Sequence, residues 1–135
     1  MNHEQKNFDA LIQYRVQQAL EAIDDAEFLL HAKRYRASVN RIYYACFYAA
    51  TAALLSKRMQ YSKHTAIIAN FDRHFIKTGL LPRDYSKTLH MAFNERQEDD
   101  YKPFAEAEPE LVQNLSSQAR QMVLGVRDFI LGQLE

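Results

Sequence analysis

Apolar residues near the beginning of the chain recur with the period of an α-helix. Between Phe8 and Leu30 they fall three or four residues apart for most of the segment, at Leu11, Ile12, Val16, Ala19, Leu20, Ile23, Ala26 and Leu30. Polar residues take the opposite side, at Gln13, Gln17, Glu21, Asp24 and Glu27. This pattern predicts an amphipathic helix over residues 8–30 with one face toward a core.

The stretch NRIYYACFYAATAALL, residues 40–55, has a different character. From Ile42 to Leu55 it holds fourteen residues without a charge, so a helix there is apolar around its circumference and is predicted to pack on every side. We expect it to begin near Ser38, to form the hub of the fold and to contribute to a dimer interface. A membrane span needs about 20 apolar residues, and the charged Arg41 and Lys57 close this run, so we do not expect a membrane protein.

Three more helices are predicted in the second half of the chain. One covers residues 62–78 with Gly79 as its C-terminal stop, and the next covers 83–98 after Pro82. The last begins at Pro109, among acidic residues that favour a first turn, and ends near Leu134. With three glycines, three prolines and no alternating strand pattern, the chain is expected to be all-α. We expect one domain over residues 1–135, an up-and-down bundle of about five helices.

Composition narrows the class of function. Seventeen basic and seventeen acidic residues give no net charge, so nucleic-acid binding would depend on a local patch. The single cysteine, Cys46, can form no internal disulfide, and the opening MNHEQKNFDA lacks the apolar core of a signal peptide, so we expect a cytoplasmic protein.

Metal and cofactor chemistry find little support in the sequence. One cysteine cannot form a cysteine-rich zinc site, and the Glu-x-x-His pairs of a di-iron bundle are absent. Glu27 and His31, four residues apart, are interpreted as a solvated face, as are the clustered acidic residues Glu95, Glu98, Asp99 and Asp100. Cys46 lies in the apolar run without a visible base, and Gly-rich phosphate loops are absent. We therefore expect neither a metal nor a cofactor.

Two basic patches are the more informative feature. Lys33, Arg34, Arg36 and Arg41 gather around the turn before the apolar run, and Lys57, Arg58, Lys63 and His64 gather after it. Such cations can hold phosphates, or they can cap helix ends and face solvent. Both interpretations stay open for each patch.

Three segments together are similar to the HEPN (higher eukaryotes and prokaryotes nucleotide-binding) family. They are SVNRIYYACFYAATAALL, KHTAIIANFDRHFIKTGLL and AFNERQEDDY, and the resemblance runs from about Arg15 to the C-terminus. It implies a bundle of four or five helices and frequently a homodimer. It also implies work beside a small nucleotidyltransferase, or as the toxin half of a toxin–antitoxin pair. Many members are metal-independent ribonucleases.

The nuclease motif of that family is an arginine followed, after four to six residues, by a histidine. It supplies a base for the ribose 2′-hydroxyl and a cation for the phosphate. Arg96 matches the arginine, but Tyr101 stands where the histidine should be, and a tyrosine with a pKa near 10 is a poor base at neutral pH. In some members a tyrosine two residues after the histidine is modified with AMP by the partner enzyme, and Pro103 occupies that place here.

Other interpretations of the same residues remain. Arg96 can pair with Asp99 or Asp100 at a helix end instead of binding a ligand. Two further pairs, Arg83 with His90 and Arg58 with His64, imitate the motif spacing, but they do not lie where the family places its motif. We interpret both pairs as surface residues.

From the resemblance and the local charge we expect a nucleotide- or RNA-binding subunit of a toxin–antitoxin or nucleotidyltransferase pair. The residues expected to line its binding site are Asn40, Arg41, Tyr44, Arg96, Asp100 and Tyr101. One alternative is a metal-independent ribonuclease with a remodelled site, in which Arg96 and Tyr101 are catalytic. Another is a non-catalytic subunit that meets a second protein. The expected partners are a second copy of the chain, an antitoxin or nucleotidyltransferase, and RNA or a nucleotide.

Overall fold

A computed structural model describes residues 2–101 and 107–134 of the chain, with side chains for 2–97 and 107–133. Within these residues it contains helices and no strand, which confirms the predicted all-α class. The elements are α1 (His3–His31), α2 (Tyr35–Ser56), α3 (His64–Phe71), a π-helical turn η1 (Asp72–Ile76), α4 (Arg83–Tyr101) and α5 (Pro109–Leu134).

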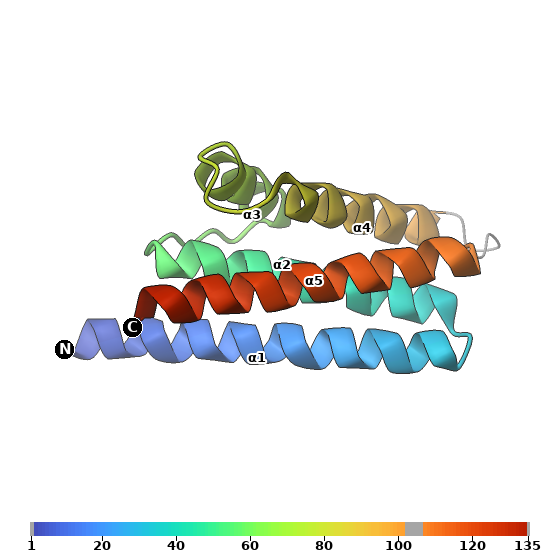
Figure 1. Ribbon diagram of the computed structural model, residues 1–135, viewed down its shortest axis with the longest axis horizontal. Coiled ribbons are helices and arrows are strands. Elements are labelled where there is room, and N and C mark those ends of the chain that lie inside the picture. The colour runs from blue at the N-terminus through green and yellow to red at the C-terminus, as the bar shows by residue number, and fades with distance from the viewer. Residues whose placement is uncertain (1, 102–106, 135) are drawn as a thin grey trace.

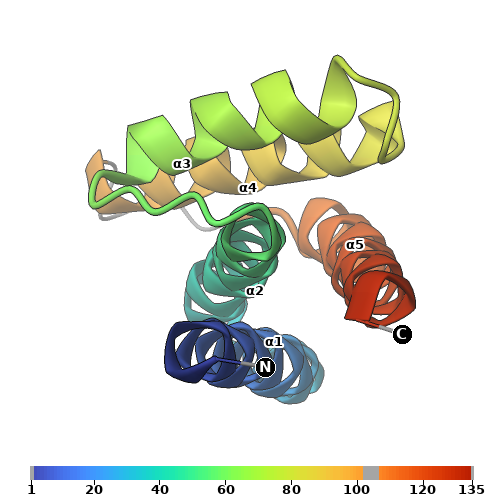
Figure 2. The ribbon, with the colours of Figure 1, turned by 90° about the vertical axis from the view of Figure 1, so that its left-hand side faces the viewer.

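Three long helices run side by side, and α3 and α4 form a layer on α2, with α4 also packing on α5. Figure 2 looks along α1, α2 and α5, with α2 between α1 and the layer made by α3 and α4. In Figure 2 α3 and α4 both run across the view, so both lie at an angle to the three long helices, and in Figure 1 α3 is seen nearly end-on. The two termini lie at the same end (Figure 1). Helix α2 contacts all four other helices, which confirms its predicted position as the hub.

Helix α1 begins five residues earlier than its apolar pattern predicted. The side chain of Asn2 accepts a hydrogen bond from the backbone N–H of Gln5, at 2.7 Å. Asparagine at this N-cap position satisfies one of the free N–H groups of the first turn, so the polar residues before Phe8 join the helix.

The apolar run in α2 is packed on most of its circumference but not all of it. Eleven of the fourteen residues from 42 to 55 are buried, while Tyr44, Tyr48 and Thr51 are half-buried. With Arg41 they form a stripe along one side of α2, spaced three or four residues apart. The prediction that α2 packs on every side is therefore wrong along this stripe, where the side chains are only partly covered.

Small residues and one hydroxyl bring α2 close to α1. Ser38 is fully buried, and its Oγ donates to the carbonyl oxygen of Ala26 at 2.8 Å. On α2 the alanines at 45, 49, 52 and 53 are buried as well. Since alanine adds little bulk, the two backbones can approach, and the buried hydroxyl keeps a hydrogen-bond partner.

The third predicted helix is shorter than its pattern indicated and ends in a π-helical turn. It begins at His64 rather than at residue 62, and the backbone N–H of Lys77 bonds the carbonyl of Asp72, at 2.9 Å. The wider turn places Phe75 against Phe129 of α5, with ring centroids 5.9 Å apart. Gly79 follows with a φ of 77°, a left-handed conformation suited to glycine.

Helices α4 and α5 pack closely at Gly125, a residue of α5 that has no side chain. A Cβ atom added at Gly125 would lie 1.8 Å from the hydroxyl oxygen of Tyr85 on α4. The glycine therefore makes room for the tyrosine where the two helices pack. Nowhere in the part of the chain that the structure describes is a helix long and apolar enough to cross a membrane.

Candidate functional site

Two arginines from different helices lie against one tyrosine ring. Arg41, in the first half of α2, has its Cζ atom 5.1 Å from the ring centroid of Tyr44, and Arg96 of α4 has its Cζ atom 5.2 Å from the same centroid. Arg96 also lies 5.1 Å from the ring centroid of Tyr43. Each such cation–π contact is worth about 0.5–2 kcal/mol, depending on how far it is desolvated.

Within the described residues, the guanidinium of Arg96 contacts aromatic rings and forms no ion pair with an acidic side chain. Its Nε atom is buried and has no hydrogen-bond partner there. The predicted alternative partners, Asp99 and Asp100, have side chains outside the described residues. Arginine is always charged in proteins, so a half-buried guanidinium stacked on two aromatic rings favours an anion beside it.

Asn40 fixes the second arginine. Its Oδ1 accepts hydrogen bonds from Arg41 Nε at 3.2 Å and from Arg41 Nη2 at 3.0 Å. The amide thus holds the guanidinium over Tyr44, although it lies one residue before Arg41 in the chain. Asn40 acts here as a positioning residue for Arg41.

A histidine that sequence reasoning treated as a surface residue completes the group. His64 is the first residue of α3, and its Nδ1 lies 2.9 Å from the hydroxyl oxygen of Tyr43. Its ring stacks on Phe47 with centroids 4.1 Å apart. His64 is therefore half-buried between α2 and α4, and the interpretation of this residue as an ordinary surface histidine is wrong. Its supposed companion Arg58 is exposed and lies over the ring of Phe8 instead.

The protonation states in this group follow from burial and charge. Burial, and then the charge of Arg96, lower the pKa of His64, so its neutral form is favoured. Burial raises the pKa of Tyr43 to about 12, so its hydroxyl keeps its proton. Tyr43 is fully buried, and that proton needs an acceptor. We assign Nδ1 of His64 as the acceptor, which leaves the ring's remaining proton on Nε2.

We call Arg41, Tyr43, Tyr44, His64 and Arg96 the arginine–tyrosine cluster. It combines two cations, exposed ring surface and a neutral imidazole N–H, which are groups that bind phosphate oxygens and stack on bases. Four residues named from the sequence, Asn40, Arg41, Tyr44 and Arg96, are brought together here. Asp100 and Tyr101 have side chains outside the described residues.

Sequence reasoning missed Tyr43 and His64 as members of the cluster. They are 21 residues apart on different elements, and Tyr43 looks like any other member of the apolar run. The segment beginning at Lys63 was part of the family resemblance, but nothing in its spacing pointed toward Arg96. Only the packing of α3 across α2 creates the contact.

Several other candidate groups have structural partners. Glu27 binds Arg120 of α5 through both carboxylate oxygens, and His90 lies 2.6 Å from a carboxylate oxygen of Asp72. Lys57, from the second basic patch, donates to the carbonyl oxygen of His74 at 3.2 Å. Among the described residues, three or more acidic, histidine or cysteine side chains do not gather as a metal site would require.

Cys46 lies on α2 in the hydrophobic core. Its side chain is fully buried, and burial raises the pKa of its thiol to about 12. A thiol reacts as the thiolate, so Cys46 is an inert core residue at neutral pH.

The fold and this cluster define a helical-bundle protein with a cationic, aromatic candidate site at the edge of its central helix. The profile of the HEPN domain family matches residues 12–128, and the chain belongs to that family. This confirms the resemblance found in the sequence.

Named relatives agree with this membership. The chain is similar to a "UPF0332 protein" of Thermotoga maritima, with 40% identity over 84% of this chain and 83% of the relative. It is also similar to two proteins of Methanocaldococcus jannaschii, each named "Putative toxin". Both are 34% identical, over 64% and 67% of this chain and over 58% and 67% of the relatives.

Proposed function

We propose that this HEPN protein binds RNA or a nucleotide through the arginine–tyrosine cluster, as the toxin-like subunit of a toxin–antitoxin or nucleotidyltransferase pair. The observation that carries the proposal is that Arg41 of α2 and Arg96 of α4 both lie against the ring of Tyr44. Two fixed cations beside an aromatic ring suit a phosphate group with an adjoining base.

The electrostatics of the cluster support an anionic ligand. Among the described side chains, neither Arg41 nor Arg96 has a carboxylate within ion-pair distance. The chain as a whole has no net charge, so attraction to RNA would come from this local pair of cations rather than from a global field. His64 would add a hydrogen bond from Nε2–H to a phosphate oxygen.

The experiment is an affinity measurement with a fluorescein-labelled single-stranded RNA of about twelve nucleotides, followed by anisotropy. Arg96→Ala and Arg41→Ala are each expected to weaken binding about tenfold, since a charge-assisted contact is worth about 1.5–3 kcal/mol. Arg83→Ala, an exposed arginine at the start of α4, is the matched control and should bind like the parent. Equal affinity in all three variants would remove the cluster as the site.

Cleavage of RNA is the second candidate, favoured by the two relatives that carry the name "Putative toxin". The neutral His64, with its proton on Nε2, is a hydrogen-bond donor rather than a general base, so binding is preferred over catalysis. A ribonuclease with the remodelled site predicts cleavage in the presence of a chelator, lost in Arg96→Ala and in Tyr101→Phe. Intact RNA after hours of incubation with the purified protein excludes this activity.

The partners are part of the same proposal. A homodimer would bring two arginine–tyrosine clusters into one assembly, and light scattering during gel filtration measures that state directly. A nucleotidyltransferase or antitoxin encoded beside this chain should co-purify with it when the two are expressed together. A neighbour that fails to bind favours the alternative of a protein-interaction subunit with another partner.

A further inference from the structure

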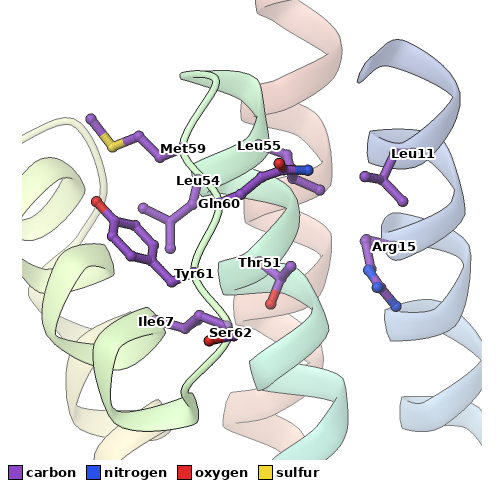
Figure 3. Close-up of a pocket in the computed structure, with 10 residues that line it drawn as sticks. All are labelled: Leu11, Arg15, Thr51, Leu54, Leu55, Met59, Gln60, Tyr61, Ser62 and Ile67. Atoms are coloured by element: carbon purple, nitrogen blue, oxygen red, sulfur yellow. The ribbon is translucent and has the colours of Figure 1, made fainter. Parts of the chain in front are cut away.

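A concave site lies at the other end of the half-buried stripe of α2. It has a volume of about 490 Å³ and opens between α1, the last turns of α2 and the segment that leads into α3 (Figure 3). Small-ligand sites in proteins measure about 300–1,000 Å³. Thr51 on its wall is ten residues after Arg41, which is about 15 Å along the helix, so this site is separate from the arginine–tyrosine cluster.

The walls divide into an apolar part and a polar part. The apolar side chains come from three elements and the loop between them, namely Leu11, Leu54, Leu55, Met59 and Ile67. Hydroxyl and amide groups come from Thr51, Gln60, Tyr61 and Ser62. Arg15 is the tenth lining residue, and none of the ten is acidic.

Arg15 is held in place without a carboxylate. Its Nη1 donates to Oε1 of Gln18 at 2.6 Å, and its Cζ lies 5.5 Å from the ring centroid of Tyr14. Its Nε is buried without a hydrogen-bond partner among the described residues. Among the described residues, Arg15 forms no ion pair with an acidic side chain. A half-buried cation that no described acid neutralises makes this wall of the pocket attractive to an anion.

We propose that the Arg15 pocket binds a small organic anion, a carboxylate or phosphate group carried on an apolar or aromatic body. Arg15 would bind the anionic group with its guanidinium, and Leu54, Leu55 and Ile67 would cover the body. A free inorganic anion would leave the apolar wall unused, and a neutral apolar molecule would give the Arg15 guanidinium no anionic partner. The pocket therefore selects for the two features together.

The test uses the full chain and two pairs of probes, octanoate with 1-octanol and AMP with adenosine, in a titration followed by ¹H–¹⁵N NMR. We expect octanoate or AMP to shift the amide resonances of Thr51, Ser62 and Ile67. The uncharged counterpart should bind about tenfold or more weakly, since it lacks the charged contact. A response to octanoate alone identifies a carboxylate ligand, and a response to AMP alone identifies a phosphate ligand.

Variants separate the charge of Arg15 from the shape of the pocket. Arg15→Gln should lose the preference for the charged probe, Arg15→Lys should keep part of it, and Arg83→Gln should behave like the parent chain. If Arg15→Gln does not fold, the comparison of charged and neutral probes on the parent chain decides. The proposal is overturned if neither anion shifts the pocket resonances, if the neutral probes bind equally well, or if only Arg41 and Tyr44 respond. Because the pocket and the cluster have separate resonances, failure here leaves the proposed RNA site untouched.

Discussion

The hydroxyl oxygen of Tyr43 and Nδ1 of His64 lie 2.9 Å apart, joining the buried centre of α2 to the first residue of α3. Because the hydrogen bond is made by Nδ1, it orients the imidazole ring and leaves the edge that carries Nε2 free for another contact. It also determines what His64 can do, because a ring nitrogen that accepts a hydrogen bond cannot at the same time donate one. Two consequences for the cluster follow from this geometry and from the charge of Arg96.

The first concerns the tautomer of His64. At neutral pH we expect Nδ1 to be unprotonated and Nε2 to carry the proton, as measured by the ¹⁵N chemical shifts of the imidazole ring. In Tyr43→Phe the donor is lost, so the two tautomers should mix. Tyr48→Phe is the control, since Tyr48 is half-buried on the same stripe and has no described hydrogen bond with His64. A protonated Nδ1 in the parent chain would contradict the assignment.

The second consequence is a pH dependence of stability. The folded chain lowers the pKa of His64 below its ordinary value of 6.5, so the unfolded chain binds more protons as the pH falls past that value. The stabilisation from the neutral ring is complete above about pH 6.5 and is lost as the pH falls through the lower pKa of the folded state.

Urea unfolding between pH 7.5 and pH 5 measures this effect. The free energy of unfolding should fall more steeply with decreasing pH in the parent chain than in His64→Asn, which cannot titrate. His3→Asn, an exposed histidine near the start of α1, is the control and should keep the steep dependence. Parallel curves for the parent chain and His64→Asn would show that His64 does not have a lowered pKa.

Two glycines in α5 should respond in opposite directions to the same substitution. Gly125→Ala drives a methyl group into Tyr85, and overpacking of this kind costs about 1–3 kcal/mol. The gain in helix propensity, about 1 kcal/mol, does not offset that cost. Gly132 has nothing within 4 Å of the added Cβ, so Gly132→Ala should stabilise by up to about 1 kcal/mol. The midpoint of urea unfolding gives both signs.

A double variant identifies the clash as the cause. In a Tyr85→Ala background the added methyl group at Gly125 meets open space, so Gly125→Ala should no longer destabilise. An equal loss of stability with and without the tyrosine ring would mean that the glycine serves another purpose.

Arg120 should contribute more to stability than a neighbouring arginine on the same helix. It joins α5 to α1 by bonding both carboxylate oxygens of Glu27 and one oxygen of Asp24, the latter at 2.6 Å. Among the described residues, Arg127 pairs only with the adjacent Asp128, at 3.1 Å. We expect Arg120→Gln to cost about 1 kcal/mol and Arg127→Gln to cost nearly nothing. Chemical unfolding at low and high salt should show the difference shrinking as salt rises.

The helices were predictable because their signals are local. Pro109 with its acidic neighbours correctly placed the start of α5, and Pro82 placed the start of α4 at Arg83. The π-helical turn after Phe71 was not predictable, because its wider hydrogen bond depends on how Phe75 packs against α5. The early start of α1 depended on one capping side chain, Asn2, in a segment without apolar residues.

The candidate site was predictable only in part, because contacts between distant segments leave no local signal in the sequence. Asn40 and Arg41 are adjacent, and the family resemblance pointed to Arg96. The contact between Tyr43 and His64 exists only because α3 crosses α2, and no spacing within either element encodes that crossing. The half-buried stripe beginning at Arg41 could not be predicted either, because the sequence does not show whether the ring of a tyrosine is covered by another element or exposed to solvent.

The measurement that tests the central claim most directly is the salt dependence of RNA binding by the parent chain and by Arg96→Gln. Each phosphate contact on a single strand contributes about 0.7 to the slope of log affinity against log salt concentration. We predict that Arg96→Gln lowers both the affinity and the slope, by about that amount, while Arg83→Gln changes neither. RNA binding with the same affinity and the same salt slope in the parent chain and Arg96→Gln would contradict the account.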